Sequence, residues 1–284
     1  MAQLALVIVN GFVWGWIVAL IALGLNLIFG LTHVINIAHG AFYMLGAVVA
    51  WYVVEATGHF WLALAVAPLA VGLLGLGVER WVLRRVEGNP VITIVATFGV
   101  MLILEHSVLL TFGGASQRIA PPVTARFPLL GIQYPAFRLV VMGFSVLAVA
   151  GVALLLRRTA VGLWMRAASQ NPEAALALGV PVDRVYFITF GLGSALAGLG
   201  GVLAAPIVSV NFLMGLDVLI LAFIVVIVGG LGNLPGSVFA AVLITEVEGV
   251  ASLYVDPTSA RVLSLLIMVG VILWRPHGLL QKAA

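Results

Sequence analysis

Apolar stretches of roughly 20 residues recur along almost the whole chain, and no other feature limits its folding so strongly. A helix of about that length crosses the hydrocarbon core of a bilayer. Of the 284 residues, 63% are hydrophobic and only 8% are charged, which leaves too little charge to cover a water-soluble surface. The sequence therefore predicts an all-α polytopic membrane protein.

Nine segments have membrane-crossing character, and we expect about eight or nine transmembrane helices in a single membrane domain over residues 1–284. The segments are 4–29, 38–55, 61–79, 91–112, 139–156, 185–206, 216–230, 236–253 and 261–274. The last segments are short and rich in glycine, so broken or re-entrant helices are expected among them. The glycine-rich run 191–201 predicts close helix packing.

Basic residues set the expected orientation, because cytoplasmic loops of membrane proteins are enriched in Lys and Arg. One side collects Arg80, Arg84, Arg85, Arg157, Arg158, Arg166, Arg184, Arg275 and Lys282, and the other collects Arg118, Arg126, Arg138 and Arg261. The richer side is expected to be cytoplasmic, with the N-terminus outside and the C-terminus inside. Residues 157–184 then form a cytoplasmic loop, and the polar residues 113–137 form the main external loop.

A very short helix is expected inside the cytoplasmic loop. Asn171 suits the N-cap, Pro172 the first helical position, and Glu173 the positive end of the helix dipole. Gly179 suits the position just past the helix end, and Asp183 is expected to cap the next span.

Such a helix is marginal in water, since isolated helices need roughly 12–15 residues. A partner protein is the expected support. The small side chains of Ala174 and Ala175 allow close backbone approach, and Glu173 and Arg166 offer charged contacts at the rim. The alternative is a polar loop that holds a short helix by chance.

Several kinds of protein are excluded by what the sequence lacks. A P-loop needs a Lys after its second Gly, and Lys282 is the only lysine. There is no cysteine and no HExxH pattern, and the five histidines are far apart in sequence. We therefore expect no enzyme activity, no metal site, no cofactor and no nucleic-acid partner for this chain.

The loop motif Glu173-Ala174-Ala175, three residues, then Gly179 resembles the EAA loop of ABC-importer permeases. In that family the motif forms a coupling helix that docks into a groove of the ATPase. The resemblance implies that Arg166, Asn171 and Pro172 belong to the same docking element. One departure is that residues 187–192 read FITFGL, where many permeases carry an isoleucine and a Leu-Pro pair.

Further motifs resemble one branch, the LivH-type permeases of bacterial branched-chain amino-acid importers. They are GLNLIFG at 24–30, NIAHGAFYMLG at 36–46, LGVPVDRV at 178–185, and GGLGNLPG at 229–236 with Glu248 downstream. Leu221 stands where relatives often carry a basic residue. Because permeases of this family serve several binding proteins, the resemblance leaves the substrate open among leucine-like amino acids, urea, amides and aromatic acids.

The resemblance implies a subunit of the bacterial inner membrane that works with several partners. These are two cytoplasmic ATPases that bind ATP and Mg, a second related or identical permease chain, and an external substrate-binding protein. The main alternative is a solitary secondary transporter or channel that uses Glu105 or the pair Glu246 and Glu248 for ion coupling.

The segment 36–40 has two interpretations. As the start of a half-helix inside the membrane, it would favour a substrate carboxylate. As a cytoplasmic turn, it would have Asn36 capping the helix and His39 among lipid headgroups.

Other polar residues also have two interpretations. Thr93 and Thr97 lie one turn apart, where they line a pathway or bridge helices. Glu246 and Glu248 either snorkel and form structural pairs or couple ions. The candidate pathway residues are Asn26, Asn36, His39, Gly40, Thr93, Thr97, Gly229, Gly230, Asn233 and Glu248.

Overall fold

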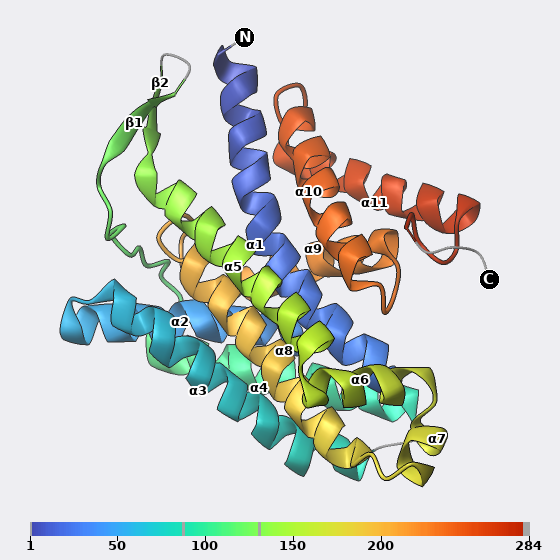
Figure 1. Ribbon diagram of the computed structural model, residues 1–284. Coiled ribbons are helices and arrows are strands. Elements are labelled where there is room, and N and C mark those ends of the chain that lie inside the picture. The colour runs from blue at the N-terminus through green and yellow to red at the C-terminus, as the bar shows by residue number, and fades with distance from the viewer. Residues whose placement is uncertain (1, 87–88, 130–131, 281–284) are drawn as a thin grey trace.

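The computed structural model describes residues 2–86, 89–129 and 132–280, and its regular elements are almost all helical (Figure 1). Lys282, counted above with the basic side, lies outside these residues. The helices are α1 (Ala2–Thr32), α2 (His39–Thr57), α3 (Phe60–Trp81), α4 (Pro90–Phe112), α5 (Ala136–Arg158), α6 (Ala160–Gln170), α7 (Pro172–Ala177), α8 (Val182–Ala204), α9 (Met214–Gly229), α10 (Leu234–Ala251) and α11 (Pro257–Trp274). A 3-10 turn, η1 (Leu83–Arg85), and two strands, β1 (Arg126–Leu129) and β2 (Ile132–Pro135), complete them.

The prediction of an all-α polytopic membrane protein is confirmed. Among the described residues, eight helices are long and apolar enough to cross a membrane. The expected span 216–230 corresponds to α9, which has only 16 residues. That length gives a rise of roughly 24 Å, less than the roughly 30 Å of a hydrocarbon core.

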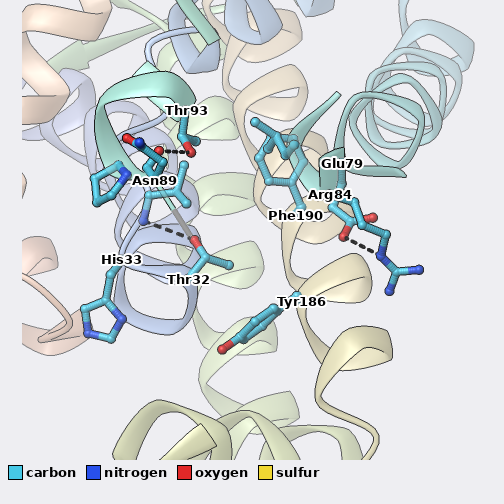
Figure 2. A pocket seen from close by; sticks show the side chains of 11 residues that line it. Thr32, His33, Glu79, Arg84, Asn89, Thr93, Tyr186 and Phe190 are labelled. Atoms are coloured by element: carbon cyan, nitrogen blue, oxygen red, sulfur yellow. Dashed lines mark hydrogen bonds and ion pairs between the residues drawn. The ribbon is translucent and has the colours of Figure 1, made fainter. Parts of the chain in front are cut away.

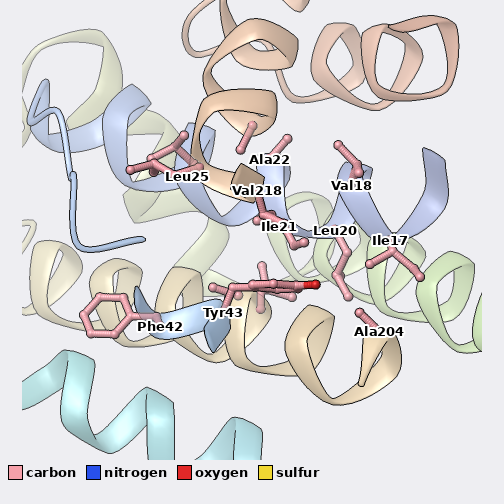
Figure 3. Close-up of a cluster of buried hydrophobic side chains, with 14 of the residues drawn as sticks. Ile17, Val18, Leu20, Ile21, Ala22, Leu25, Phe42, Tyr43, Ala204 and Val218 are labelled. Atoms are coloured by element: carbon pink, nitrogen blue, oxygen red, sulfur yellow. The ribbon is translucent and has the colours of Figure 1, made fainter. Parts of the chain in front are cut away.

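Helix α1 forms the centre of the bundle and packs mainly against α8 and α10. Its side chains from Ile17 to Ile28 are buried, and Figure 3 shows several of them meeting Tyr43 of α2, Ala204 of α8 and Val218 of α9. Helix α10 runs antiparallel to α1, since Thr245 Oγ1 donates to the Gly11 carbonyl while Gly232 lies against Gly30.

Close packing between helices depends on small residues, as the glycine-rich run 191–201 predicts. A Cβ on Gly46 would stand 2.1 Å from the Gly198 carbonyl oxygen, and one on Gly75 would stand 2.3 Å from Ser194 Oγ. Such distances leave no room for a side chain, so the backbones of α2 and α3 lie directly against α8.

The bundle has two distinct ends (Figure 1). The start of α1 lies near the β1–β2 hairpin, where Tyr134 Oη donates to Asn10 Oδ1 at 3.0 Å. We call this the hairpin end. Helices α6 and α7 lie at the other end, the α7 end, close to Leu31 of α1. Neither the hairpin inside residues 113–137 nor helix α6 was predicted from the sequence.

Candidate functional site

Helix α7 begins where the sequence predicts it. Asn171 Oδ1 accepts a hydrogen bond from the Ala174 N–H at 2.9 Å, and Pro172 occupies the first turn together with Glu173. Gly179 adopts φ +84°, in the left-handed region, and its N–H donates to the Leu176 carbonyl. Both ends of this six-residue helix are therefore fixed by local chemistry.

One face of α7 is anchored to the bundle. Ala175 is buried in a small apolar cluster with Met165 and Ala168 of α6 and Val182 and Val185 of α8. A helix this short is not stable in isolation, and its packing in this cluster stabilises it.

Two large apolar side chains, one in α7 and one directly after it, are exposed. Leu176 is 64% exposed and Leu178 is 86% exposed. Glu173 and Ala174 of α7 and Arg166 of α6 are also exposed. An anchored helix that presents leucines outward is typical of a surface that another protein covers.

The expectation that Asp183 caps the next span is wrong. Helix α8 has no side-chain cap, and Asp183 Oδ2 instead lies 3.1 Å from Arg84 Nη2 of the turn η1. The ion pair ties η1 to the first turn of α8, directly after α7.

A cavity of about 770 Å³, which we call the groove, lies between α1, α5, α6 and α10. Its walls are mainly apolar, with contributions such as Leu27, Val152, Met165 and Val238. Its polar lining residues are Asn26, Arg157, Arg166, Ser169 and Asn233.

Asn26 lines the groove, but its polar atoms are engaged within the chain. Its Nδ2 donates to Ser237 Oγ at 2.7 Å and to the Gly230 carbonyl at 3.2 Å, and its Oδ1 accepts from the Gly232 N–H at 2.6 Å. This fully buried amide therefore holds the turn between α9 and α10 against α1.

The turn itself needs its glycines. Gly230 and Gly232 have φ of +103° and +81°, and a Cβ on Gly229 would meet the Gly236 backbone at 2.5 Å. Asn233 caps α10 by accepting from the Gly236 N–H. Gly229 and Gly230 are buried and shape the turn, while Asn233 faces the groove.

Residues 33–38 turn back into the protein, so α2 begins inside the bundle. His39 is fully buried, with Nε2 at 2.9 Å from the Ile21 carbonyl oxygen of α1. Asn36 is also fully buried and does not cap α2, which has no side-chain cap. The interpretation of this segment as a surface turn is therefore wrong.

Two contacts hold that segment in place. Thr97 Oγ1 of α4 accepts from the Ile37 N–H and lies 3.3 Å from the Ile35 carbonyl oxygen, so Thr97 ties α4 to the connection between α1 and α2. A Cβ on Gly40 would stand 2.3 Å from the Gly215 carbonyl oxygen, so the start of α2 touches the start of α9.

A second cavity, of about 170 Å³, lies between the end of α1, the α3–η1 region, the start of α4 and α8. Figure 2 shows Asn89 and Thr93 on one side of it and Glu79 and Arg84 on the other, with Phe190 of α8 between them. Thr93 therefore lies away from the groove. The sequence reasoning did not single out Glu79.

The acidic candidates lie in other places. Glu248 of α10 forms a hydrogen-bonded ion pair with Arg261 of α11, whose Nη1 also donates to the Asp217 carbonyl. Glu248 thus has a structural partner, as one of its two interpretations expects. Glu246 lies against Gly11 of α1, and Glu105 is buried on α4.

The predicted pathway residues thus fall into separate groups. Asn26 and Asn233 line the groove, Gly229 and Gly230 shape the turn next to it, and Asn36, His39, Gly40 and Thr97 gather at the start of α2. Thr93 and Glu248 belong to neither group. Groove residues that sequence reasoning missed include Arg157 and Ser169, whose only signal was their place in the cytoplasmic loop.

Comparison with known proteins agrees with this architecture. A family model described as "Branched-chain amino acid transport system / permease component" matches residues 7–272. The chain is 28% identical over 291 residues to the high-affinity branched-chain amino acid transport system permease protein LivH of Escherichia coli K12, covering 96% of this chain and 94% of that protein.

Two further relatives extend the comparison. The chain is 25% identical to the permease protein BraD of Pseudomonas aeruginosa, with 97% of this chain and 95% of that protein covered. It is also 25% identical to the permease protein LivM of Escherichia coli K12, over 92% of this chain and 67% of that protein. No solved structure matches the chain. Because the family model spans most of the sequence, the chain belongs to the family of permease components of branched-chain amino acid transport systems.

Proposed function

We propose that this chain is the membrane-spanning subunit of an ATP-driven importer that moves branched-chain or similar small amino acids into the bacterial cytoplasm by alternating access. The observation that carries the proposal is helix α7, which is anchored by Ala175 and presents Leu176 and Leu178 outward. A carrier that works alone has no use for such a docking surface.

The partner at α7 is an ABC ATPase, and two of these subunits supply the ATP and Mg sites that this chain does not contribute. ATP binding closes the two ATPases and moves α7. The movement passes to α8 through the apolar cluster around Ala175, and to the α3–η1 region through the ion pair of Arg84 with Asp183.

The groove is this chain's share of the translocation path. Its apolar walls suit an aliphatic side chain, and Arg157 and Arg166 attract a carboxylate that leaves toward the α7 end. A path that is open on one side exposes its polar groups to lipid, which is costly. A second permease chain, a copy or a relative, therefore closes it, and an external binding protein delivers substrate at the hairpin end.

The positive-inside rule supports the orientation, because most of the arginines belong to the α7 end. That orientation makes α7 cytoplasmic, with the N-terminus outside and the C-terminus in the cytoplasm.

The test is reconstitution of the chain in proteoliposomes with its ATPases, second permease and binding protein. We expect leucine uptake that requires ATP, and the variant Leu178→Gln should reduce uptake and stimulated ATP hydrolysis at least tenfold. Because Leu178 is 86% exposed, the folded chain should persist. The matched control is Val255→Gln, at an exposed apolar residue between α10 and α11.

A different result would favour the solitary carrier. Uptake by the chain alone, driven by an ion gradient and indifferent to Leu178→Gln, would contradict the importer.

A further inference from the structure

We propose that the 170 Å³ cavity between α1, α3, α4 and α8 binds a free zwitterionic amino acid of about leucine size, entering from the α7 end. The inference rests on the proposed function for the choice of ligand. It assigns a second site, apart from the groove.

The cavity is separate from the groove. The two share no lining residue, and α1 stands between them, with α8 on one side and α10 on the other. At the end of α1, Gly30 and Leu31 line the groove while Thr32 and His33 line the cavity.

Charges of both signs occur side by side in the cavity wall. Arg84 Nε lies 4.0 Å from Glu79 Oε1, and Glu79 is only 8% exposed (Figure 2). A carboxylate buried this deeply is stabilised by charged hydrogen bonds, which a ligand ammonium can add. The Arg84 guanidinium suits a ligand carboxylate because its planar fork of N–H donors matches the two carboxylate oxygens. Adjacent opposite charges match the α-ammonium and α-carboxylate of one amino acid.

The remaining walls suit an aliphatic side chain. Val34, Leu83, Pro90 and Phe190 supply apolar surface. A volume of about 170 Å³ corresponds to roughly six water molecules at about 30 Å³ each. That space is large enough for a small amino acid.

The cavity also lies next to the ion pair that ties η1 to α8. Arg84 contacts Asp183 at 3.1 Å, in the first turn of α8, immediately after α7. A ligand carboxylate on Arg84 competes with Asp183 and so loosens the tie between η1 and α8. Accumulated amino acid on the α7 side would thereby slow transport.

Binding is tested on the assembled complex without nucleotide or binding protein, with radiolabelled leucine as the probe. We expect saturable binding that Glu79→Gln and Arg84→Gln each weaken at least tenfold. The matched controls Glu55→Gln and Arg85→Gln, at exposed residues outside the cavity, should stay within twofold of the wild type.

Analogues test the zwitterion directly. The amine 3-methylbutylamine lacks the carboxylate and 4-methylpentanoate lacks the ammonium, so each should compete at least tenfold less well than leucine. Val34→Phe fills the cavity without changing charge and should abolish the same binding. This variant keeps the test valid if a charge variant fails to fold.

The outcomes separate this inference from the proposed function. ATP-driven uptake together with leucine binding that ignores Glu79→Gln, Arg84→Gln and Val34→Phe would overturn the second site and leave the importer standing. Binding sensitive to these variants in a chain without ATP-driven uptake would support the site and overturn the importer.

Discussion

Asn26 joins three backbone or side-chain groups of one turn to the central helix, so a substitution there affects the fold and the groove together. In Asn26→Leu, the Gly232 N–H loses its acceptor, the Gly230 carbonyl keeps only the Asn233 N–H, and Ser237 Oγ keeps only the Asn233 carbonyl. We expect a loss of about 1–3 kcal/mol in unfolding free energy, the cost of unsatisfied buried polar groups. Thermal unfolding of the purified chain measures it, and Gln133→Leu in the exposed hairpin is the control. Equal stability of the two variants would contradict the role of Asn26.

Gly40 offers a sharper test of backbone contact. A Cβ at Gly40 would overlap the Gly215 carbonyl oxygen, whereas a Cβ at Gly99 of α4 would meet nothing within 4 Å. We expect Gly40→Ala to destabilise the chain by about 1–3 kcal/mol through overpacking. Gly99→Ala should be neutral or stabilising by up to about 1 kcal/mol, because Ala favours helix. Similar melting temperatures for both variants would refute the contact between α2 and α9.

Among helices, α7 depends on the left-handed residue at its end. Gly179→Ala places a side chain at φ +84° and should cost about 1–2 kcal/mol locally. Asn tolerates that conformation better, so Gly179→Asn should retain most of the stability. Hydrogen exchange of residues 172–178 measures the difference, with Gly151→Ala, where a Cβ meets nothing within 4 Å, as the control. Identical exchange in all three variants would count against the helix end described here.

Helix α11 has an acid-sensitive cap. Asp256 Oδ1 accepts from the N–H groups of Thr258 and Ser259, both at 3.0 Å. Hydrogen bonding, chiefly from the Ser259 hydroxyl, lowers the pKa of Asp256 below its ordinary 3.8. Because the folded pKa lies below the unfolded one, the cap is complete above pH 3.8 and is lost as the pH falls through the folded value.

Amide exchange of residues 258–262, corrected for intrinsic rates, should therefore accelerate below about pH 3.8. Asp256→Asn keeps a capping oxygen that does not titrate in this range. It should remove the pH dependence; an acid response that survives in the variant would point to another group.

Capping residues in the sequence predicted where a helix begins and ends better than where a segment lies in the bundle. The cap and end of α7 follow from Asn171, Pro172 and Gly179, each of which acts on its own neighbours. The sequence left Asn36 open between a membrane half-helix and a cytoplasmic turn, because the position of residues 35–39 depends on contacts with Thr97 and Ile21, outside the segment. The cavity with Glu79 was missed because its lining comes from five elements that are separate in sequence: α1, α3, η1, α4 and α8.

At the scale of the whole molecule, the proposed orientation can be read with thiol reagents, because the chain contains no cysteine. Gln133→Cys, in the hairpin, should react with a membrane-impermeant maleimide in intact cells. Gln170→Cys, at the end of α6, should react only after the membrane is opened. Both positions are exposed, so labelling reports sidedness. The reverse pattern would invert the topology and remove the ATPase from α7.

Helices that enter the membrane one after another during synthesis cannot all reach their final packing at the same time. The amide of Asn26 must wait for partners 204 and 211 positions further along the chain. Helix α1 therefore enters the bilayer while the Asn26 amide lacks these hydrogen-bond partners. The partners become available only when α10 packs against α1. Chains cut short before Ser237 should remain loosely assembled and be recognised by quality-control proteases, so the centre of this bundle is among the last parts to mature.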